Sequence, residues 1–373
     1  MVLRGAGAAA YLDIDQMINL AKQSGCNAIH PGYGFLSENA DFARKCEFAG
    51  LIFVGPRTET LEILGDKAKA RALAQRCGVP VLKGSAGAVT LAQAKEFFQS
   101  LKNSPGILIK AIMGGGGRGM RQVRKMEELE EAYSRCQSEA KQAFGNGDVY
   151  VEELAPQSRH IEIQILGDGA GGISHLWERE CTIQRQYQKL VEIAPSPALS
   201  AALRKKLTAN AVAMAKELNY RSAGTFEFLV ATGAKSGENI YAFIEANARL
   251  QVEHTVTEET LDIDIVQAQL QIAAGKSLDN LGLSQNNIPK PHGYTIQLRV
   301  NMETMGQDGT AHPAGGTITS FDLPSGRGIR IDTYGYSGYR SSPRYDSLLA
   351  KSICHSNSDN FAEAASLAYR ALC

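Results

Sequence analysis

The stretch Tyr241–Glu259, YAFIEANARLQVEHTVTEE, places reactive side chains at every second position. If it forms an extended strand, alternate side chains point to opposite faces of a sheet. One face then carries Glu245, Asn247, Arg249, Gln251 and Glu253, and the other face is mainly apolar. Carboxylate and amide oxygens suit Mg²⁺, and an arginine can clamp an anion through two hydrogen bonds. The pattern predicts a binding site on a β-sheet; the plainer alternative is a solvated sheet face.

Other segments of the chain share this alternation. In HIEIQIL (160–166) and TFEFLV (225–230), polar residues alternate with isoleucine or phenylalanine, and TIQLRVN (295–301) repeats the habit. This is typical of antiparallel strands with one dry face. A hairpin would bring Glu227 across from Glu245, and facing carboxylates repel unless a cation lies between them. These residues predict a divalent-metal site, with Asn247 as a further oxygen ligand.

A glycine-rich loop, MGGGGRGM (113–120), lies between two predicted strands. Its glycines allow backbone amides to approach a phosphate closely. The loop has neither the G-K-[ST] ending of a P-loop nor the G-x-G-x-x-G spacing. Its position between strands favours a flap that closes over a nucleotide, although a surface hairpin is the alternative. Lys110 and Lys67 could neutralise the phosphates.

The order of predicted elements gives an α/β (α+β) fold in four parts. Residues 1–56 read as a partial doubly wound α/β domain, and 57–81 as a helical linker. Residues 82–154 read as a small glycine-flap unit, and 155–373 as a mainly antiparallel region. Residues 57–77 are expected to be helical throughout. A capping box at Thr255–Glu258 is expected to start a helix over about 263–274.

Composition excludes several classes of function. The 373 residues contain 39 Lys and Arg and 39 Asp and Glu, so the formal net charge is zero. The chain therefore lacks the excess of positive charge that is typical of proteins binding nucleic acid or an anionic membrane. No apolar run is long enough to cross a bilayer, and the N-terminus lacks the regions of a signal peptide. Seven scattered cysteines without a C-x-x-C pair fit a reducing compartment, and we expect a cytoplasmic protein.

Several motifs together resemble one family. They are HPGYGFLSEN (30–39), GDK (65–67), KAIMGGGGRGM (110–120), RHIEIQIL (159–166), CTIQRQYQK (181–189), AGTFEFL (223–229), FIEANARLQVEHTVTE (243–258) and SGRGIR (325–330). In this order they resemble the biotin carboxylases, the ATP-grasp component of biotin-dependent carboxylases. The resemblance implies an ATP-grasp fold truncated at both ends, since the family's opening Asn-Arg-Gly-Glu strand is missing. Tyr187 replaces a frequent histidine, and Ala248 a usual proline or threonine.

The resemblance implies that MgATP and bicarbonate are used to carboxylate biotin through carboxyphosphate. ATP would be bound by Lys67, Lys110, Gly114, Gly115, Gly116, Gly117, Glu152, His160 and Gln184. The metals, Mg²⁺ or Mn²⁺, would be held by Glu227, Glu245 and Asn247. Bicarbonate would lie among Lys189, Arg249, Gln251, Val252 and Glu253. Glu253 would be the base, with Lys189 and Arg249 also catalytic. Arg330 would stabilise the biotin enolate, and Tyr33 would lie near biotin.

The resemblance also implies partners. No Met-Lys-Met biotin-attachment motif occurs, so biotin would arrive on a carrier domain, and a carboxyltransferase domain would act next. A homodimer or larger assembly is expected, in the cytoplasm or, in a eukaryote, the mitochondrial matrix. The final carboxyl acceptor stays open. Two alternatives remain: another ATP-grasp ligase such as a carbamoyl-phosphate synthetase-like enzyme, and a non-catalytic ATP-binding module.

Overall fold

An eight-stranded sheet forms the centre of the computed structural model, which describes residues 3–5, 7–101, 104–112, 119–155, 157–232, 241–307 and 309–373. Its strand order is β10-β9-β6-β7-β8-β11-β17-β15, and every neighbouring pair is antiparallel. The strands are β6 (Ser158–Asp168), β7 (Ile173–Arg185), β8 (Gln188–Ala194), β9 (Arg221–Ala231), β10 (Tyr241–Asn247), β11 (Tyr294–Asn301), β15 (Ile329–Thr333) and β17 (Leu348–Ser356). The prediction of antiparallel strands is confirmed.

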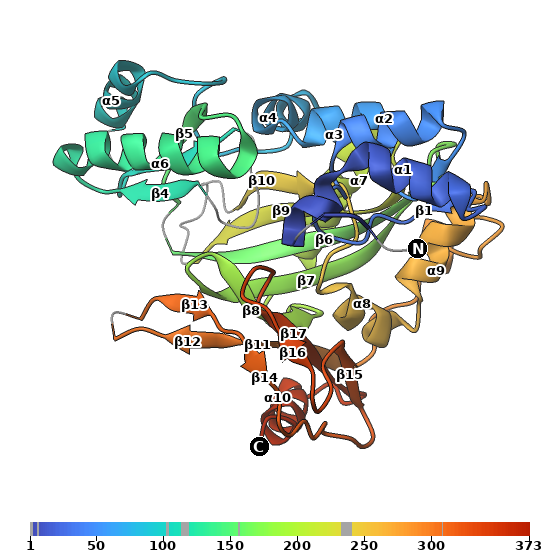
Figure 1. Cartoon of the computed structure of the whole chain (residues 1–373). Helices are drawn as coiled ribbons and strands as arrows, with labels where there is room; N and C mark the ends of the chain where they lie inside the picture. Colours follow the sequence, from blue (N-terminus) through green and yellow to red (C-terminus); the bar gives the residue numbers. More distant parts are fainter. Residues whose placement is uncertain are drawn as a thin grey trace.

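Helices cover one face of this sheet, above it in Figure 1. They are α1 (Ile14–Gln23), α2 (Ala40–Phe48), α3 (Thr58–Leu64), α4 (Lys67–Arg76) and α7 (Ala201–Glu217), with η1 (Gly7–Leu12) and a short parallel pair, β1 (Ala28–Ile29) and β2 (Ile52–Phe53). A shared core joins the helices to the sheet: Leu73 and Leu207 pack with Ile163, Phe226 and Phe243. The dry face predicted by the alternation is therefore buried, and the polar face lies on the other side.

The glycine-flap segment forms a separate small sheet, seen at the left of Figure 1. Its strands are β3 (Ile107–Ala111), β4 (Met120–Val123) and β5 (Val149–Glu153), and its helices are η2 (Met126–Glu128), α5 (Leu91–Ser100) and α6 (Leu129–Phe144). β3 and β4 pair as an antiparallel hairpin, as predicted. Gly114, Gly115, Gly116 and Gly117 lie outside the described residues. Ile107, Ile109 and Val151 belong to a core of this unit's own.

The remaining elements complete the lower part of the molecule in Figure 1. They are α8 (His254–Leu261), α9 (Ile265–Ala273), η3 (Gln285–Asn287), β12 (Glu303–Met305), β13 (Ala311–Pro313), β14 (Gly316–Thr317), β16 (Arg340–Ser341) and α10 (Phe361–Arg370). α10 packs on β11 and β17 through Ala364 and Ala368. No helix in the described ranges is long and apolar enough to cross a membrane.

The stretch 241–259 is not one strand, and this prediction was wrong beyond Asn247. β10 ends at Asn247, and α8 begins at His254. The chain leaves the ladder because the Ala248 amide donates to the Glu38 carboxylate at 3.0 Å rather than to a strand. A bulge between Phe243 and Glu245 also shifts the alternation. The side chains after Asn247 therefore converge on the site from a turn.

Two helix boundaries also differ from the predictions. Thr255–Glu258 lies inside α8, and the following helix, α9, is capped by Asp264, whose carboxylate accepts from the Gln267 amide at 2.7 Å. The predicted helix over 57–77 divides into α3 and α4 around Gly65 and Asp66. It divides because Asp66 caps α4, accepting from the Ala68 and Lys69 amides at 2.9 and 3.1 Å.

We predict that Asp66→Ala lowers the free energy of unfolding by about 1 kcal/mol, because two amides at the start of α4 lose their acceptor. Asp66→Asn should retain most of the stability. Denaturant unfolding of both variants is the measurement. The control is Asp41→Ala, an exposed first-turn residue of α2 that is not its cap. Equal effects of Asp66→Ala and Asp41→Ala would contradict the assignment of the cap.

Candidate functional site

A row of charged side chains crosses the polar face of the large sheet. The register places Arg179 of β7 opposite Glu162 of β6, Glu162 opposite Glu227 of β9, and Glu227 opposite Glu245 of β10. The predicted pairing of Glu227 with Glu245 is thus confirmed. Glu162 and Glu227 are 0% and 2% exposed. Neighbouring buried carboxylates repel, so this row is stable only with cations beside it.

Lys189 of β8 supplies one of these cations. Its Nζ lies 2.6 Å from Glu162 Oε2, 3.0 Å from Glu227 Oε1 and 2.7 Å from Glu253 Oε1. An ammonium has three donors, and each has a carboxylate partner. Burial disfavours the charged lysine, but the three carboxylates outweigh burial and raise the pKa of Lys189 well above its usual value. Lys189 therefore remains charged and holds three strands and a turn together.

Arg179 is the second buried cation and was missed in the sequence. It is fully buried, and its guanidinium donates to Glu162 Oε1 at 2.5 Å, Gln164 Oε1 at 2.7 Å and Thr225 Oγ1 at 3.1 Å. The sequence around Arg179, WERE (177–180), does not show that this arginine is buried. Its position opposite Glu162 depends on the pairing of β7 with β6. Arg179 fixes Glu162 in the orientation that Lys189 uses.

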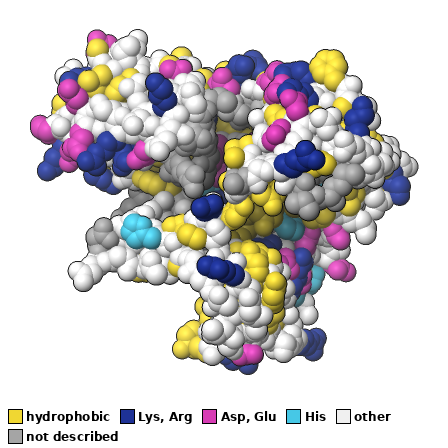
Figure 2. Space-filling model, viewed as in Figure 1, with side chains coloured by type: hydrophobic (Ala, Val, Ile, Leu, Met, Phe, Trp, Pro, Cys, Tyr) yellow, Lys and Arg dark blue, Asp and Glu magenta, His cyan; other side chains and the backbone are white. Residues whose placement is uncertain are grey.

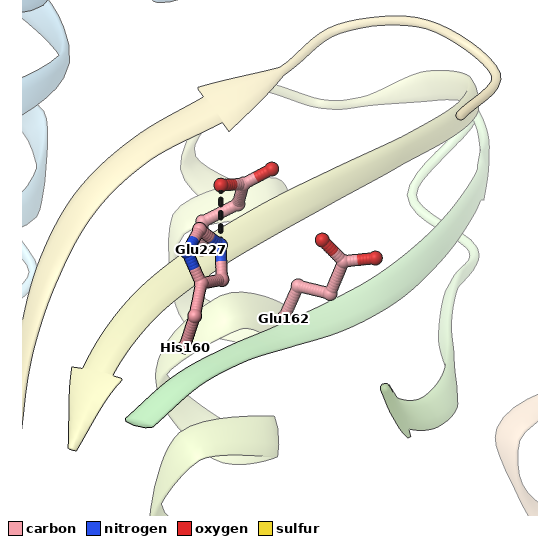
Figure 3. Close-up of side chains that lie close together, drawn as sticks. All are labelled: His160, Glu162 and Glu227. Atoms are coloured by element: carbon pink, nitrogen blue, oxygen red, sulfur yellow. Dashed lines mark ion pairs between the residues drawn. The ribbon is translucent and has the colours of Figure 1, made fainter. Parts of the chain in front are cut away.

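His160 and Glu227 form the part of the row shown in Figure 3, where His160 and Glu162 project from β6 and Glu227 from β9. His160 Nε2 lies 2.6 Å from Glu227 Oε2. Ligand atoms of His160, Glu162 and Glu227 lie within 4.8 Å of one another. Asn247 Nδ2 donates to Glu227 Oε1 at 2.6 Å. The carboxylates and the imidazole offer ligand atoms to a divalent cation. Asn247 turns its Nδ2 donor toward Glu227, while its Oδ1 accepts from Arg249.

Glu253 lies just before α8, with its carboxylate between two cations. One oxygen accepts from Lys189, and the other accepts from Arg299 Nη2 at 3.0 Å. Burial raises the pKa of Glu253, but Lys189 and then Arg299 outweigh it and hold that pKa well below its usual range. Arg299, another residue missed in the sequence, also pairs with Glu192 Oε1 at 2.6 Å. Its place among the alternating polar positions of TIQLRVN (295–301) was the one sequence feature that could have predicted its location on the polar face of the sheet.

Arg249 contacts the N-terminal segment. Its Nε lies 2.8 Å from Glu38 Oε2, and Glu38 belongs to HPGYGFLSEN. The other guanidinium nitrogens reach Gln251 Oε1 and Asn247 Oδ1, both at 3.3 Å. Gln251 Nε2 is buried without a hydrogen-bond partner among the described residues. Arg249 and Gln251 are therefore in contact with each other, whereas Glu253 contacts Lys189 and Arg299. Glu38 was not anticipated.

Lys110 and Glu152 face the site from the glycine-flap unit. Lys110 Nζ lies 2.6 Å from Glu152 Oε2, and Arg71 Nη1 of α4 lies 2.7 Å from Glu152 Oε1. Lys67, also on α4, lies 3.4 Å from Glu245 Oε2. These pairs place the two predicted phosphate-binding lysines beside carboxylates of two different strands.

Gln184, a further predicted site residue, lies on β7 of the same sheet. Gln184 Nε2 lies 3.1 Å from His160 Nδ1 and also donates to the Cys181 carbonyl at 2.7 Å. Gln184 therefore lies directly beside the predicted ligand row. Its position fits the grouping of Gln184 with His160 in the predicted ATP site.

Arg330 of β15 belongs to a neighbouring set. Its guanidinium donates to Glu258 Oε2 at 3.0 Å, Glu259 Oε1 at 3.1 Å and Asp332 Oδ1 at 2.9 Å. Lys351 of β17 connects this set to the Glu253 turn: its Nζ donates to the Val252 carbonyl at 3.0 Å and lies 3.2 Å from Asp332 Oδ2. Lys351 was not anticipated from the sequence.

Tyr33 stays accessible at 42% exposure. Burial of the rest of its side chain raises the pKa of Tyr33, and Asp346 adds to that rise. Figure 2 shows Lys and Arg side chains interspersed with Asp and Glu over the face in view.

Three family models together match most of the chain. The biotin carboxylase N-terminal domain matches residues 1–61, the ATP-binding domain of the carbamoyl-phosphate synthase L chain matches 66–281, and the biotin carboxylase C-terminal domain matches 297–373. The model named for carbamoyl-phosphate synthase is thus flanked on both sides by biotin carboxylase models.

Relatives of known identity agree with these matches. The chain is 49% identical to pyruvate carboxylase of Aspergillus niger over 346 residues, which is 92% of this chain and 28% of that protein. It is also 49% identical to mitochondrial pyruvate carboxylase of Homo sapiens, over 93% of this chain and 29% of the human protein. The chain therefore spans less than a third of the length of these relatives.

Solved structures share the fold at high similarity. The biotin carboxylase domain dimer of Hydrogenobacter thermophilus 2-oxoglutarate carboxylase, in complex with MgADP, ADP and bicarbonate, has a TM-score of 0.90 and 42% identity over 97% of this chain and 77% of that one. The biotin carboxylase of Campylobacter jejuni in its β,γ-ATP complex has a TM-score of 0.89 and 38% identity over 98% and 78%. On its motifs, its fold and these similarities, the chain belongs to the biotin carboxylase family.

Proposed function

We propose that this chain carries out the ATP- and bicarbonate-dependent carboxylation of biotin on a carrier domain, the first half-reaction of a biotin-dependent carboxylase. The observation that carries the proposal is the Lys189 ammonium bound by Glu162, Glu227 and Glu253, with Arg299 on the far oxygen of Glu253. This arrangement concentrates cations around one ionised carboxylate, which suits a base acting on an anion.

For ATP, we propose that Lys67 and Lys110 bind phosphate oxygens, with Gly114–Gly117 covering them. His160, Gln184 and Glu152 would make the remaining nucleotide contacts. Glu227, Glu245 and Asn247 would hold Mg²⁺, which would neutralise phosphate charge when bound. The chain's own part is positioning and charge compensation, which phosphoryl transfer needs more than covalent help.

For bicarbonate, we propose a position beside Arg249, Gln251 and Val252, within reach of Lys189 and Glu253. The unpaired Gln251 Nε2 is available to donate to the anion. In the free chain Glu253 is a weak base because two cations lower its pKa. Bound bicarbonate is an anion and would partly offset the positive charge of Lys189 and Arg299. The pKa of Glu253 would then rise toward the working range of a general base. Deprotonated bicarbonate would then attack the γ-phosphate of ATP, the bond from that phosphorus to the bridging oxygen would break, and carboxyphosphate and ADP would form.

For biotin, we propose that Arg330 stabilises the enolate oxygen after proton loss and that Tyr33 lies beside the ring. Carboxyphosphate would release CO₂ and phosphate, phosphate would accept the proton of the biotin ureido nitrogen, and that nitrogen would attack CO₂ to give carboxybiotin. Glu258, Glu259 and Asp332 orient the Arg330 guanidinium, and an arginine presents fixed parallel donors to an oxyanion.

The whole protein would extend this reaction. We propose that it is a carboxylase of the pyruvate carboxylase type, that it works as a homodimer or larger assembly, and that carrier and carboxyltransferase domains lie on the same or another chain. The 48–49% identity to pyruvate carboxylases over more than nine-tenths of this chain supports this choice. A cytoplasmic or mitochondrial-matrix location fits the same relatives.

We predict that the purified chain hydrolyses MgATP only when bicarbonate is present, and faster when free biotin is added. Coupled measurement of ADP release, with each substrate omitted in turn, is the test. Turnover that requires ammonia or glutamine would point to a carbamoyl-phosphate synthetase-like ligase. Nucleotide binding without turnover would point to a non-catalytic ATP-binding module. Either result would overturn the proposed function.

We predict that Glu253→Gln reduces bicarbonate-dependent ATP cleavage by about 10²–10⁴-fold, since the amide cannot accept the bicarbonate proton. MgATP affinity should change less than about twofold, because the residue is proposed to contact bicarbonate and not ATP. The matched control is Glu217→Gln on the exposed side of α7, which should leave both quantities unchanged. Unchanged turnover in Glu253→Gln would reject Glu253 as the base.

We predict that Arg330→Met retains bicarbonate-dependent ATP cleavage but loses its stimulation by biotin. The reason is that Arg330 is proposed to act only on the biotin oxygen. Rates with and without biotin should be compared in this variant and in Arg327→Met, an exposed arginine of the same segment. Full biotin stimulation in Arg330→Met would remove Arg330 from the proposed biotin site.

A further inference from the structure

Tyr150 lies on the face of the glycine-flap sheet that also carries Lys110 and Glu152. In β5 the neighbouring Val149 and Val151 enter the core of that unit, so Tyr150 and Glu152 point to the opposite face. The register sets Tyr150 directly across from Lys110 of β3. Lys110 Nζ lies 5.9 Å from the centre of the Tyr150 ring. The tyrosine is thus part of the same surface as the proposed phosphate-binding lysine.

The Tyr150 hydroxyl is buried and has no hydrogen-bond partner within the described ranges. The residue is 1% exposed. Other buried tyrosines in the described part of the chain are satisfied: Tyr133 donates to the Val89 carbonyl at 2.7 Å, and Tyr220 to the Ala223 carbonyl at 3.2 Å. Buried tyrosine hydroxyls usually find a partner, because a buried unpaired polar group is costly.

Charged groups of the site surround this hydroxyl. Burial raises the pKa of Tyr150; Lys110 opposes the rise, while Glu152 and Glu245 add to it. Glu245, a predicted metal ligand on β10 of the large sheet, is thus among the charges that act on the Tyr150 hydroxyl. Because the phenol keeps its proton, it can donate a hydrogen bond to an acceptor that enters between these two sheets.

We infer that the Tyr150 hydroxyl donates a hydrogen bond to a phosphate oxygen of the bound nucleotide and is a further nucleotide-binding residue of this site. The inference rests on the proposed function only in that the site takes a nucleoside polyphosphate. A phosphate oxygen fits better than a sugar or base atom. It accepts without donating, and Lys110 beside the ring attracts negative charge. The ligand would satisfy the hydroxyl, which has no partner among the described residues.

The test is Tyr150→Phe, which removes one oxygen and keeps the ring over Lys110. Calorimetric titration of the full chain with MgATP and MgADP should show about 10- to 100-fold weaker binding, as expected for a lost hydrogen bond to a charged group. The thermal midpoint without nucleotide should be unchanged or higher, because an unpaired buried hydroxyl has been removed. Tyr133→Phe is the matched control. It loses a satisfied hydrogen bond, so it should lower the midpoint and keep nucleotide affinity.

Four results would overturn the inference. The first is Tyr150→Phe binding MgATP as tightly as the unchanged chain. The second is a lowered midpoint like that of Tyr133→Phe, which would show an internal partner for the hydroxyl. The third is an equal loss of affinity for adenosine, which has no phosphate. The binding assay needs neither bicarbonate nor biotin. It therefore tests the role of Tyr150 separately from the proposed function, even in a chain that binds MgATP without turnover. A chain that does not bind MgATP would overturn the inference as well.

Discussion

The contact of Lys189 with Glu162, Glu227 and Glu253 is the interaction on which the rest of the site depends. It joins β6, β8 and β9 of the large sheet to the turn before α8. Burying a carboxylate without a partner costs free energy, and three such carboxylates in contact would oppose the packing of these strands and the turn against one another. The ammonium removes that cost and also lowers the pKa of Glu253. The same charge compensation that stabilises the sheet therefore keeps Glu253, the proposed base, ionised.

This balance extends outward through arginines. Arg179 compensates Glu162 from β7, and Arg299 compensates Glu253 and Glu192 from β11. Burial raises the pKa of Glu192 to about 7, with Glu253 adding to the rise and Arg299 opposing it. Glu192 therefore takes up a proton near neutral pH more readily than its neighbours.

The sequence allowed the antiparallel sheet, the glycine-loop hairpin and the pairing of Glu227 with Glu245 to be predicted, because each depends on period-two alternation or local turn chemistry. It did not predict the turn after Asn247, since that turn depends on Glu38, a residue about two hundred positions earlier. Arg179 and Lys351 were missed for the same reason: each gains its role from strands that are adjacent only in space. The roles assigned to individual site residues remain predictions.

The order of the charges along the chain has a consequence for synthesis on the ribosome. Of these residues Glu162 emerges first, Arg179 and Lys189 follow on the next two strands, and Glu227 comes next. Glu253 and Arg299 follow, and Lys351 comes after them. The growing chain can therefore neutralise its first carboxylate early, whereas the Glu253 turn has its full set of cations only after β11 and β17 exist. A nascent chain stopped before β11 would leave the edge of β8 unpaired beside an acidic sheet face, and unpaired strand edges make folding intermediates prone to aggregate.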